Sequence, residues 1–277
     1  AVRLRDFLSK RITGGVNLLT ARRNSHPIEL AERLVADLTL EEFDHVVVTG
    51  DVTNLSLPGE FQRVSRLLKP LGGYDDVTVV PGNHDIYTRG AAKERRFESY
   101  FSHLVFRSGR DRSGWEFPTV KELGDVVLAG LCSALPTPLL TAWGRVGHEQ
   151  LDRLQAALGK PEYDQRFKIV ALHHNLHPRT GFAEATASLK DRDEVVSRLL
   201  ELKVNLVLHG HTHKPHRFAV ARGGHTMYVV GSGSSTQCSA DADRVARYNI
   251  YSIEEGSLAR IRTRVYDRAR RRFEWLV

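Results

Sequence analysis

The chain has 277 residues, a formal net charge of +7 and an isoelectric point near 9.5. Its 41% hydrophobic content suits a folded core, and no run approaches the roughly 20 apolar residues of a membrane span. The two cysteines, Cys132 and Cys238, build no disulfide framework, which favours a reducing compartment. These features exclude a disordered chain and a disulfide-rich secreted domain. We expect one α/β domain over residues 1–277 in the cytoplasm.

Helical and strand patterns alternate in the first three quarters of the chain. We predict helices at 28–40, 59–69, 92–104, 148–158 and 191–202. We predict buried strands, which are short, apolar and mostly β-branched, at 46–49, 77–80, 125–131, 168–172 and 204–208. Such alternation predicts a parallel sheet with right-handed crossovers.

The pattern changes after His213. We predict strands at 217–221, 225–230, 248–253, 259–266 and 272–275. Turns at Gly223-Gly224 and at 254–256 join them, so residues 214–277 should form a mostly antiparallel second sheet.

Four segments that carry metal-ligand side chains each follow one of the apolar strands. They are Thr49–Asn54, Pro81–Asp85, Leu172–His174 and Leu208–His213. Ligands of open α/β sheets bind outside the carboxyl ends of the strands, so these segments should meet in one crevice. Asp, Asn and His without thiolate suit Mn²⁺, Fe or Zn²⁺. Two such ions roughly 3.5–4 Å apart can hold both oxygens of a phosphoryl displacement, which predicts phosphoester hydrolysis.

The histidines in these segments differ in their expected roles. Strand-like alternation would place His211 and His213 on one side. His173 directly follows an apolar strand and is the favoured ligand of its pair, which leaves His174 for an outer-shell or substrate contact. We predict His209 as a packed core histidine and His177 as part of a solvated loop.

The combined segments resemble the calcineurin-like metallophosphoesterase superfamily. Its signature runs D-x-H, G-D-x-x-[DN], G-N-H-[DE], a lone His at a strand end and G-H-x-H, and the last four blocks occur here in order. The resemblance implies two mixed β-sheets packed face to face with helices outside, a four-layer α/β/β/α sandwich. It also implies two divalent ions, with Mn²⁺ favoured over Fe or Zn²⁺. The implied metal ligands are Asp51 as the bridge, Asn83, His173, His211 and His213.

The resemblance gives His84 a role without metal. It would stabilise charge on the phosphoryl group or protonate the leaving oxygen while a metal-activated hydroxide attacks. The family's first block is absent, because no Asp-x-His occurs in residues 1–50. We expect that the first strand has been lost from this chain, which opens on Ala1. The alternative is a family member without the block that acts as a non-catalytic binding scaffold.

Basic segments bear on the substrate and the partners. Residues 1–26 form a basic amphipathic arm or lid, in which 3–23 could contact an anionic membrane surface at its inner face or cover the active-site mouth. The arginines at alternate positions from 260 to 264 favour a solvated strand face. An anionic phosphoester substrate is expected. It could resemble that of the cyclic-nucleotide phosphodiesterases or that of the UDP-diacylglucosamine type of lipid-linked pyrophosphohydrolase. Nucleic acid is not expected, since interleaved aromatics are missing.

Overall fold

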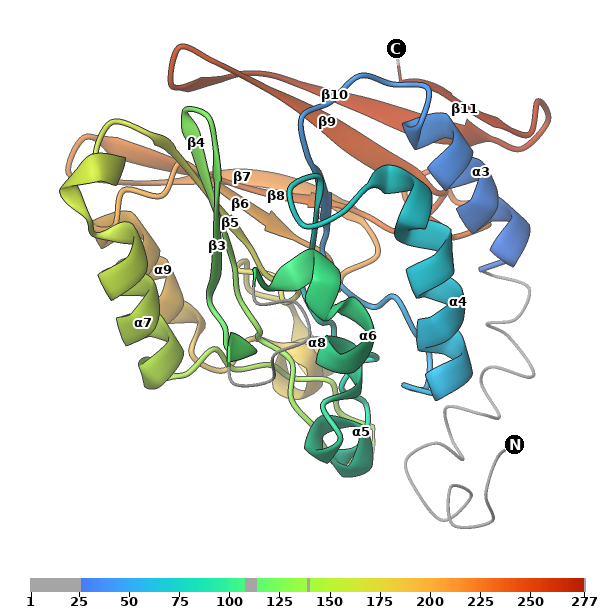
Figure 1. Ribbon diagram of the computed structural model, residues 1–277, viewed down its shortest axis with the longest axis horizontal. Helices are drawn as coiled ribbons and strands as arrows, with labels where there is room; N and C mark the ends of the chain where they lie inside the picture. The colour runs from blue at the N-terminus through green and yellow to red at the C-terminus, as the bar shows by residue number, and fades with distance from the viewer. Residues whose placement is uncertain (1–25, 108–113, 139, 277) are drawn as a thin grey trace.

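The largest sheet of the computed structural model has six strands (Figure 1). The model describes residues 26–107, 114–138 and 140–276. The strand order is β3 (Thr119–Leu123), β4 (Val126–Gly130), β5 (Phe167–Ala171), β6 (Leu206–His209), β8 (His225–Ser232) and β7 (Pro215–Arg222). The four central strands are parallel, and the outer two pair antiparallel with their neighbours. The nearly continuous burial of β4, β5 and β6 shows that both faces of this sheet are covered.

Two smaller sheets contribute to a second β layer. One is the parallel pair β1 (Val46–Val48) and β2 (Val77–Val79). The other is the antiparallel set β9 (Arg247–Glu254), β10 (Ser257–Asp267) and β11 (Arg272–Trp275). Apolar side chains of both small sheets pack in one core with those of the six-stranded sheet, for example Val77, Ile261 and Leu206.

Helices cover the outside of the two β layers. The six-stranded sheet is covered by α7 (His148–Leu158) and α9 (Arg192–Glu201), which bury Leu151, Leu154 and Leu199 at helical spacing. The small sheets are covered by α3 (Ile28–Leu38), α4 (Pro58–Leu68) and α6 (Arg96–Val105). Among the described residues there are also the helices α5 (Arg89–Lys93) and α8 (Gly181–Ala187) and the 3₁₀ turns η3 (Lys69–Leu71) and η5 (Pro161–Tyr163). The α/β fold with two β layers and outer helices is as predicted.

Several predicted elements differ in the structure. Residues 214–277 do not form one sheet, because β8 pairs in parallel with β6 and carries β7 with it into the large sheet. Conversely, β1 and β2 do not join the large sheet. The predicted helix 92–104 is divided at Arg95, which has a left-handed φ of 49°. Strand β3 and helix α8 were not predicted, since their charged or small residues hide the apolar pattern.

Two predictions concern membranes and the arm. None of the helices in the described ranges combines the length and the apolar character needed to cross a bilayer. The predicted arm of residues 1–26 lies outside the described residues except for His26, so its membrane or lid role stays a prediction.

Candidate metal centre

The carboxyl ends of strands from two different sheets meet at one place. In the two-stranded sheet, the turn after β1 carries Asp51 and the turn after β2 carries Asn83 and His84. In the six-stranded sheet, His173 follows β5 and His211 follows β6. Glycines allow the two turns to touch: a Cβ on Gly50 would lie 2.6 Å from the backbone nitrogen of Gly82. Gly50 also has a φ of 93°, which L side chains rarely adopt. The glycines of both motifs therefore serve close backbone approach as well as turning.

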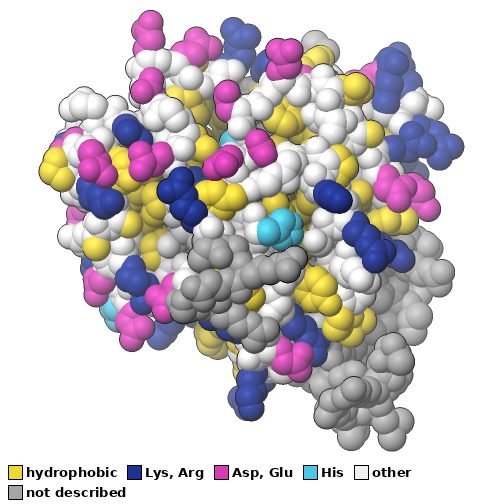
Figure 2. Space-filling model, viewed as in Figure 1, with side chains coloured by type: hydrophobic (Ala, Val, Ile, Leu, Met, Phe, Trp, Pro, Cys, Tyr) yellow, Lys and Arg dark blue, Asp and Glu magenta, His cyan; other side chains and the backbone are white. Residues whose placement is uncertain are grey.

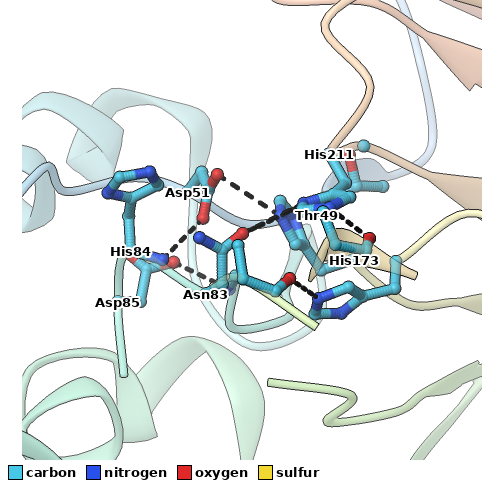
Figure 3. Close-up of polar contacts among 12 residues, drawn as sticks. Thr49, Asp51, Asn83, His84, Asp85, His173 and His211 are labelled. Atoms are coloured by element: carbon cyan, nitrogen blue, oxygen red, sulfur yellow. Dashed lines mark hydrogen bonds and ion pairs between the residues drawn. The ribbon is translucent and has the colours of Figure 1, made fainter. Parts of the chain in front are cut away.

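Four predicted ligands converge in this place, as Figure 3 shows. His173 Nε2 lies 3.1 Å from Asn83 Oδ1 and 3.3 Å from Asp51 Oδ2. His211 Nδ1 lies 3.0 Å from Asn83 Oδ1 and 3.2 Å from His173 Nε2. Donor atoms bound about 2.0–2.2 Å from one ion lie about 3 Å from each other. The spacing of these four atoms is thus that of neighbouring ligands.

The tautomers of the two histidines follow from their backbone contacts. His173 Nδ1 lies 2.7 Å from the carbonyl oxygen of Thr49, and His211 Nε2 lies 2.9 Å from that of Ala187. A carbonyl oxygen only accepts, so these ring nitrogens carry the protons. In the neutral rings, His173 Nε2 and His211 Nδ1 then present lone pairs toward the oxygens of Asn83 and Asp51. Orienting a ligand histidine through a backbone carbonyl is typical of metal sites.

The electrostatics of the cluster call for a cation. Burial opposes the charge of Asp51, but His173 and His84 outweigh it and hold the pKa of Asp51 well below its ordinary value. Burial also lowers the pKa of His173, yet Asp51 outweighs burial and raises it above the ordinary value. A proton on His173 Nε2 is one way to separate the four acceptors, and a divalent ion among them is the other. The residues present therefore fit a metal ion.

Asp85 is a site residue to which sequence reasoning assigned no role. Its carboxylate is 1% exposed and accepts hydrogen bonds from Gly82 N at 2.9 Å and from Thr53 N at 2.8 Å. Burial and the neighbouring charge of Asp51 raise the pKa of Asp85 to about 7. This carboxyl group holds the two ligand turns together. The signal in the sequence that could have identified Asp85 is its position as the acidic residue directly after His84 in the motif.

His84 lies beside the cluster without joining its donor atoms. Its Nδ1 donates to the carbonyl of Asn54 at 2.8 Å, and its ring stacks on Tyr87 with centroids 5.3 Å apart. Its backbone N–H donates to Asp51 Oδ1 at 2.9 Å. In Figure 3 the ring lies on the other side of Asp51 from His173 and His211. This arrangement suits a side chain that acts on substrate rather than on a metal.

His213 does not share the contacts described above among the four candidate ligand atoms. Residues 210–214 are not a strand, since His211 and His213 have left-handed φ values of 64° and 54°. The expectation that alternation puts both on one side is therefore wrong in its premise. The His213 ring instead meets His26 edge-on at a centroid distance of 6.1 Å. Its role as a ligand of a second ion stays a prediction.

Three other histidines have structural environments. His174 is fully buried. Its Nδ1 lies 2.8 Å from Ser133 Oγ, and its Nε2 lies 3.0 Å from the carbonyl oxygen of Ala142. Both ring nitrogens therefore contact the protein, and His174 has a supporting role beside the cluster. His177 lies in a loop, as predicted, but is only partly exposed, and its ring stacks on His216 with centroids 3.8 Å apart. His209 is 1% exposed, as predicted for a core residue.

No three His, Cys, Asp or Glu side chains within the described ranges form a metal-binding group by themselves. The cluster depends on the amide oxygen of Asn83, which lies within 3.1 Å of both ligand histidines. A neutral amide ligand adds no charge, so Asp51 is the single anion among the four donors. The arrangement therefore suits an ion that accepts mixed oxygen and nitrogen ligands.

Comparisons with known proteins agree with the fold. The calcineurin-like phosphoesterase family model matches residues 26–215. A dimetal phosphatase from Danio rerio superposes with a TM-score of 0.57 at 14% identity, covering 86% of this chain and 82% of that chain. A Vps29 mutant from Entamoeba histolytica reaches 0.42 at 15% identity, with 91% and 89% covered. At such identities these likenesses concern the fold alone. A search of curated proteins found no match.

Proposed function

This chain belongs to the calcineurin-like phosphoesterase family, and we propose that it is a metal-dependent hydrolase of a phosphodiester or pyrophosphate bond. The observation that carries the proposal is the convergence of Asp51, Asn83, His173 and His211, whose acceptor atoms face one another at 3.0–3.3 Å. Such a cluster is costly without a cation. With one, the four side chains would hold an ion that can polarise a phosphoester and activate water.

Two divalent ions, with Mn²⁺ favoured, are the proposed cofactors. When bound, they would supply Lewis-acid activation of the ester and of water. Asp51, Asn83, His173 and His211 would hold the first ion, with Asp51 shared by the second and His213 assigned to it. Thr49 and Ala187 keep the two ligand rings in the tautomers that binding needs.

His84 is the proposed catalytic residue. His84 Nδ1–H donates a hydrogen bond to the carbonyl of Asn54, and the stack on Tyr87 fixes the ring plane. The ring is therefore positioned to donate through Nε2 to the leaving oxygen or to charge on the phosphoryl group. Donation through Nε2 as well uses the protonated imidazolium form. The positive net charge of the chain favours an anionic substrate.

The experiment compares metal binding and turnover in the same preparations. Manganese content would be measured beside hydrolysis of bis(p-nitrophenyl) phosphate, cyclic nucleotides and a nucleotide-diphosphate lipid. Asp51→Asn should lose both metal and activity, whereas Asp164→Asn, at an exposed position, should keep both. Full metal content and full turnover in Asp51→Asn would contradict the assignment.

A second candidate is a non-catalytic scaffold, favoured by the absence of Asp-x-His from residues 1–50. It predicts that the wild-type protein binds one metal ion or none and turns over no ester in the panel. The panel also separates soluble diesters from lipid-linked diphosphates as substrates.

A further inference from the structure

A hollow of about 400 Å³ lies at the edge of the C-terminal sheet. Beside it, β11 pairs with Arg264–Asp267 of β10, and Leu276 N donates a further hydrogen bond to the carbonyl of Thr263. Within the described residues no strand continues the pairing toward the start of β10 on this side. The hollow is lined by Arg217, Ile261, Arg262, Thr263, Trp275 and Leu276.

Two guanidinium groups give the hollow its charge. Arg217 Nη2 donates to Thr263 Oγ1 at 3.0 Å, which ties β7 to β10, and Arg262 lies 4.4 Å from the centroid of the Trp275 ring. Neither forms an ion pair with a carboxylate in the part of the chain that the structure describes. Arg264 on the same strand does, with Asp37 and Glu41. The hollow thus holds two positive charges that no carboxylate of the described residues neutralises.

Exposed apolar side chains lie beside these charges. Trp275 is 39% exposed and Leu276 is 60% exposed. Figure 2 shows Lys and Arg side chains at its upper right, with some Asp and Glu among them, over the end of the molecule where β10 and β11 lie. An indole and a leucine beside arginines match the boundary between lipid headgroups and acyl chains, where Trp is enriched.

We propose that this face docks on an anionic lipid surface, with a headgroup phosphate between Arg217 and Arg262. Trp275 and Leu276 would then lie at the headgroup level. Guanidinium groups bind phosphate well, since they present several donors in one plane. A single-stranded nucleic acid would need successive stacking platforms, and this hollow offers one indole. The proposal does not depend on the catalytic activity and uses residues separate from the predicted arm.

Binding of the full chain to vesicles tests the proposal. Flotation with phosphatidylglycerol and phosphatidylcholine in equal parts should recover at least about tenfold more protein than flotation with phosphatidylcholine alone. Recovery should fall severalfold between 0.05 M and 0.5 M salt, because the charges are screened. Arg217→Gln combined with Arg262→Gln, and separately Trp275→Ala with Leu276→Ser, should each lower binding about tenfold.

Matched controls separate the effect of the hollow on vesicle binding from the effects of exposed apolar and basic side chains elsewhere on the surface. Leu40→Ser removes a leucine that is 83% exposed elsewhere, and Arg63→Gln removes an exposed arginine on α4. Both should bind as the wild type does. If the hollow variants also bind as the wild type does, or if Leu40→Ser weakens binding equally, the proposal is overturned.

Fluorescence reports directly on Trp275. Brominated phosphatidylglycerol should quench the wild-type emission, and the quenching should vanish in Trp275→Phe while flotation stays within about threefold. Trp115 is 4% exposed and cannot account for contact with lipid. Trp143 is partly exposed, so both emission measurements are made with Trp143→Phe as the common background. Quenching retained in Trp275→Phe contradicts the proposal. So does displacement of the vesicles by a single-stranded oligonucleotide that depends on the same two arginines. Thermal melting checks that every variant is folded.

Discussion

Two clusters of charged and polar side chains in this molecule differ in how their hydrogen-bond donors and acceptors are paired. In the cluster between α3 and β10, the Arg264 guanidinium donates to Asp37 at 2.8 Å, to Glu41 and to the carbonyl of Phe273. Donors there meet acceptors. In the cluster at the strand ends, acceptor atoms of Asp51, Asn83, His173 and His211 meet one another.

The difference separates a structural role from a binding role. In the Arg264 cluster both carboxylates are paired with the two terminal guanidinium nitrogens, although Arg264 Nε has no hydrogen-bond partner among the described residues. The cluster ties a helix to the sheet beneath it. The Asp51 cluster needs a proton or a cation from outside. Partly buried charges that the chain satisfies itself stabilise the fold, whereas acceptors that it leaves facing one another mark a site for a ligand.

The largest expected effect separates turnover from ion binding. His84→Ala should keep its metal content and its stability but lose kcat by about 10²- to 10⁴-fold, the range for a positioned acid or base. Steady-state kinetics on substrates with good and poor leaving groups would measure this. A smaller loss on nitrophenyl esters indicates an acid role, and equal losses indicate charge stabilisation. Loss of metal in this variant would place His84 in the ligand cluster instead.

Breaking the Arg264 cluster should lower the stability of the fold and leave metal binding unchanged. Arg264→Met leaves the carboxylates of Asp37 and Glu41 without their partner, and we expect a loss on the order of 3 kcal/mol in the free energy of unfolding. Denaturant unfolding gives the value. Arg262→Met is the matched control, since this exposed neighbour on the same strand should change stability by no more than about 0.5 kcal/mol. Equal effects of the two changes would remove the distinction between paired and unpaired arginines.

The open cluster should gain stability from an ion. At a free Mn²⁺ concentration of about 100 times the Kd, linkage predicts about 2.7 kcal/mol of added stability. Arg264→Met should show the same increment, because its site is intact, and Asp51→Asn should show none. Denaturant titrations with Mn²⁺ and with EDTA measure the difference. An undiminished increment in Asp51→Asn would mean that the ion binds elsewhere.

The convergence of the four candidate ligands could be predicted from the sequence, whereas the sheets that support them could not. Asp51, Asn83, His173 and His211 follow apolar strands, and local patterns locate strand ends well. Which strands share a sheet depends on pairing between distant segments, so the separation of β1 and β2 from β5 and β6 was not predictable. The same limit explains β8, whose parallel partner β6 precedes it beyond the β7 hairpin.

The backbone of the last motif was a second limit. His211 and His213 look like alternate residues of a strand, but left-handed φ values turn the chain there and give the two rings different neighbours. The support from Asp85 was missed for another reason. Its bonds to Gly82 and Thr53 bring together two turns that are distant in sequence, and no local pattern reports such a contact.

The smallest expected effect is a loss of stability at alkaline pH that involves Asp37 of the Arg264 cluster. Burial and the hydrogen bond to Asp37 at 2.6 Å raise the pKa of Tyr248 above its ordinary value of 10.0. Below pH 10 both the folded and the unfolded chain keep this proton, so it causes no pH dependence. Above pH 10 the unfolded chain releases it and the folded chain does not. Stability should then fall by up to about 1.4 kcal/mol per pH unit from this group.

Tyr248→Phe should remove that part of the slope, whereas Tyr228→Phe, at a residue 45% exposed, should not. Burial raises the pKa of Tyr251 to about 12, so a residual slope remains in both variants. Unfolding free energies measured from pH 9 to 11 decide the matter, and identical slopes in the two variants would show that Asp37 does not hold the Tyr248 proton.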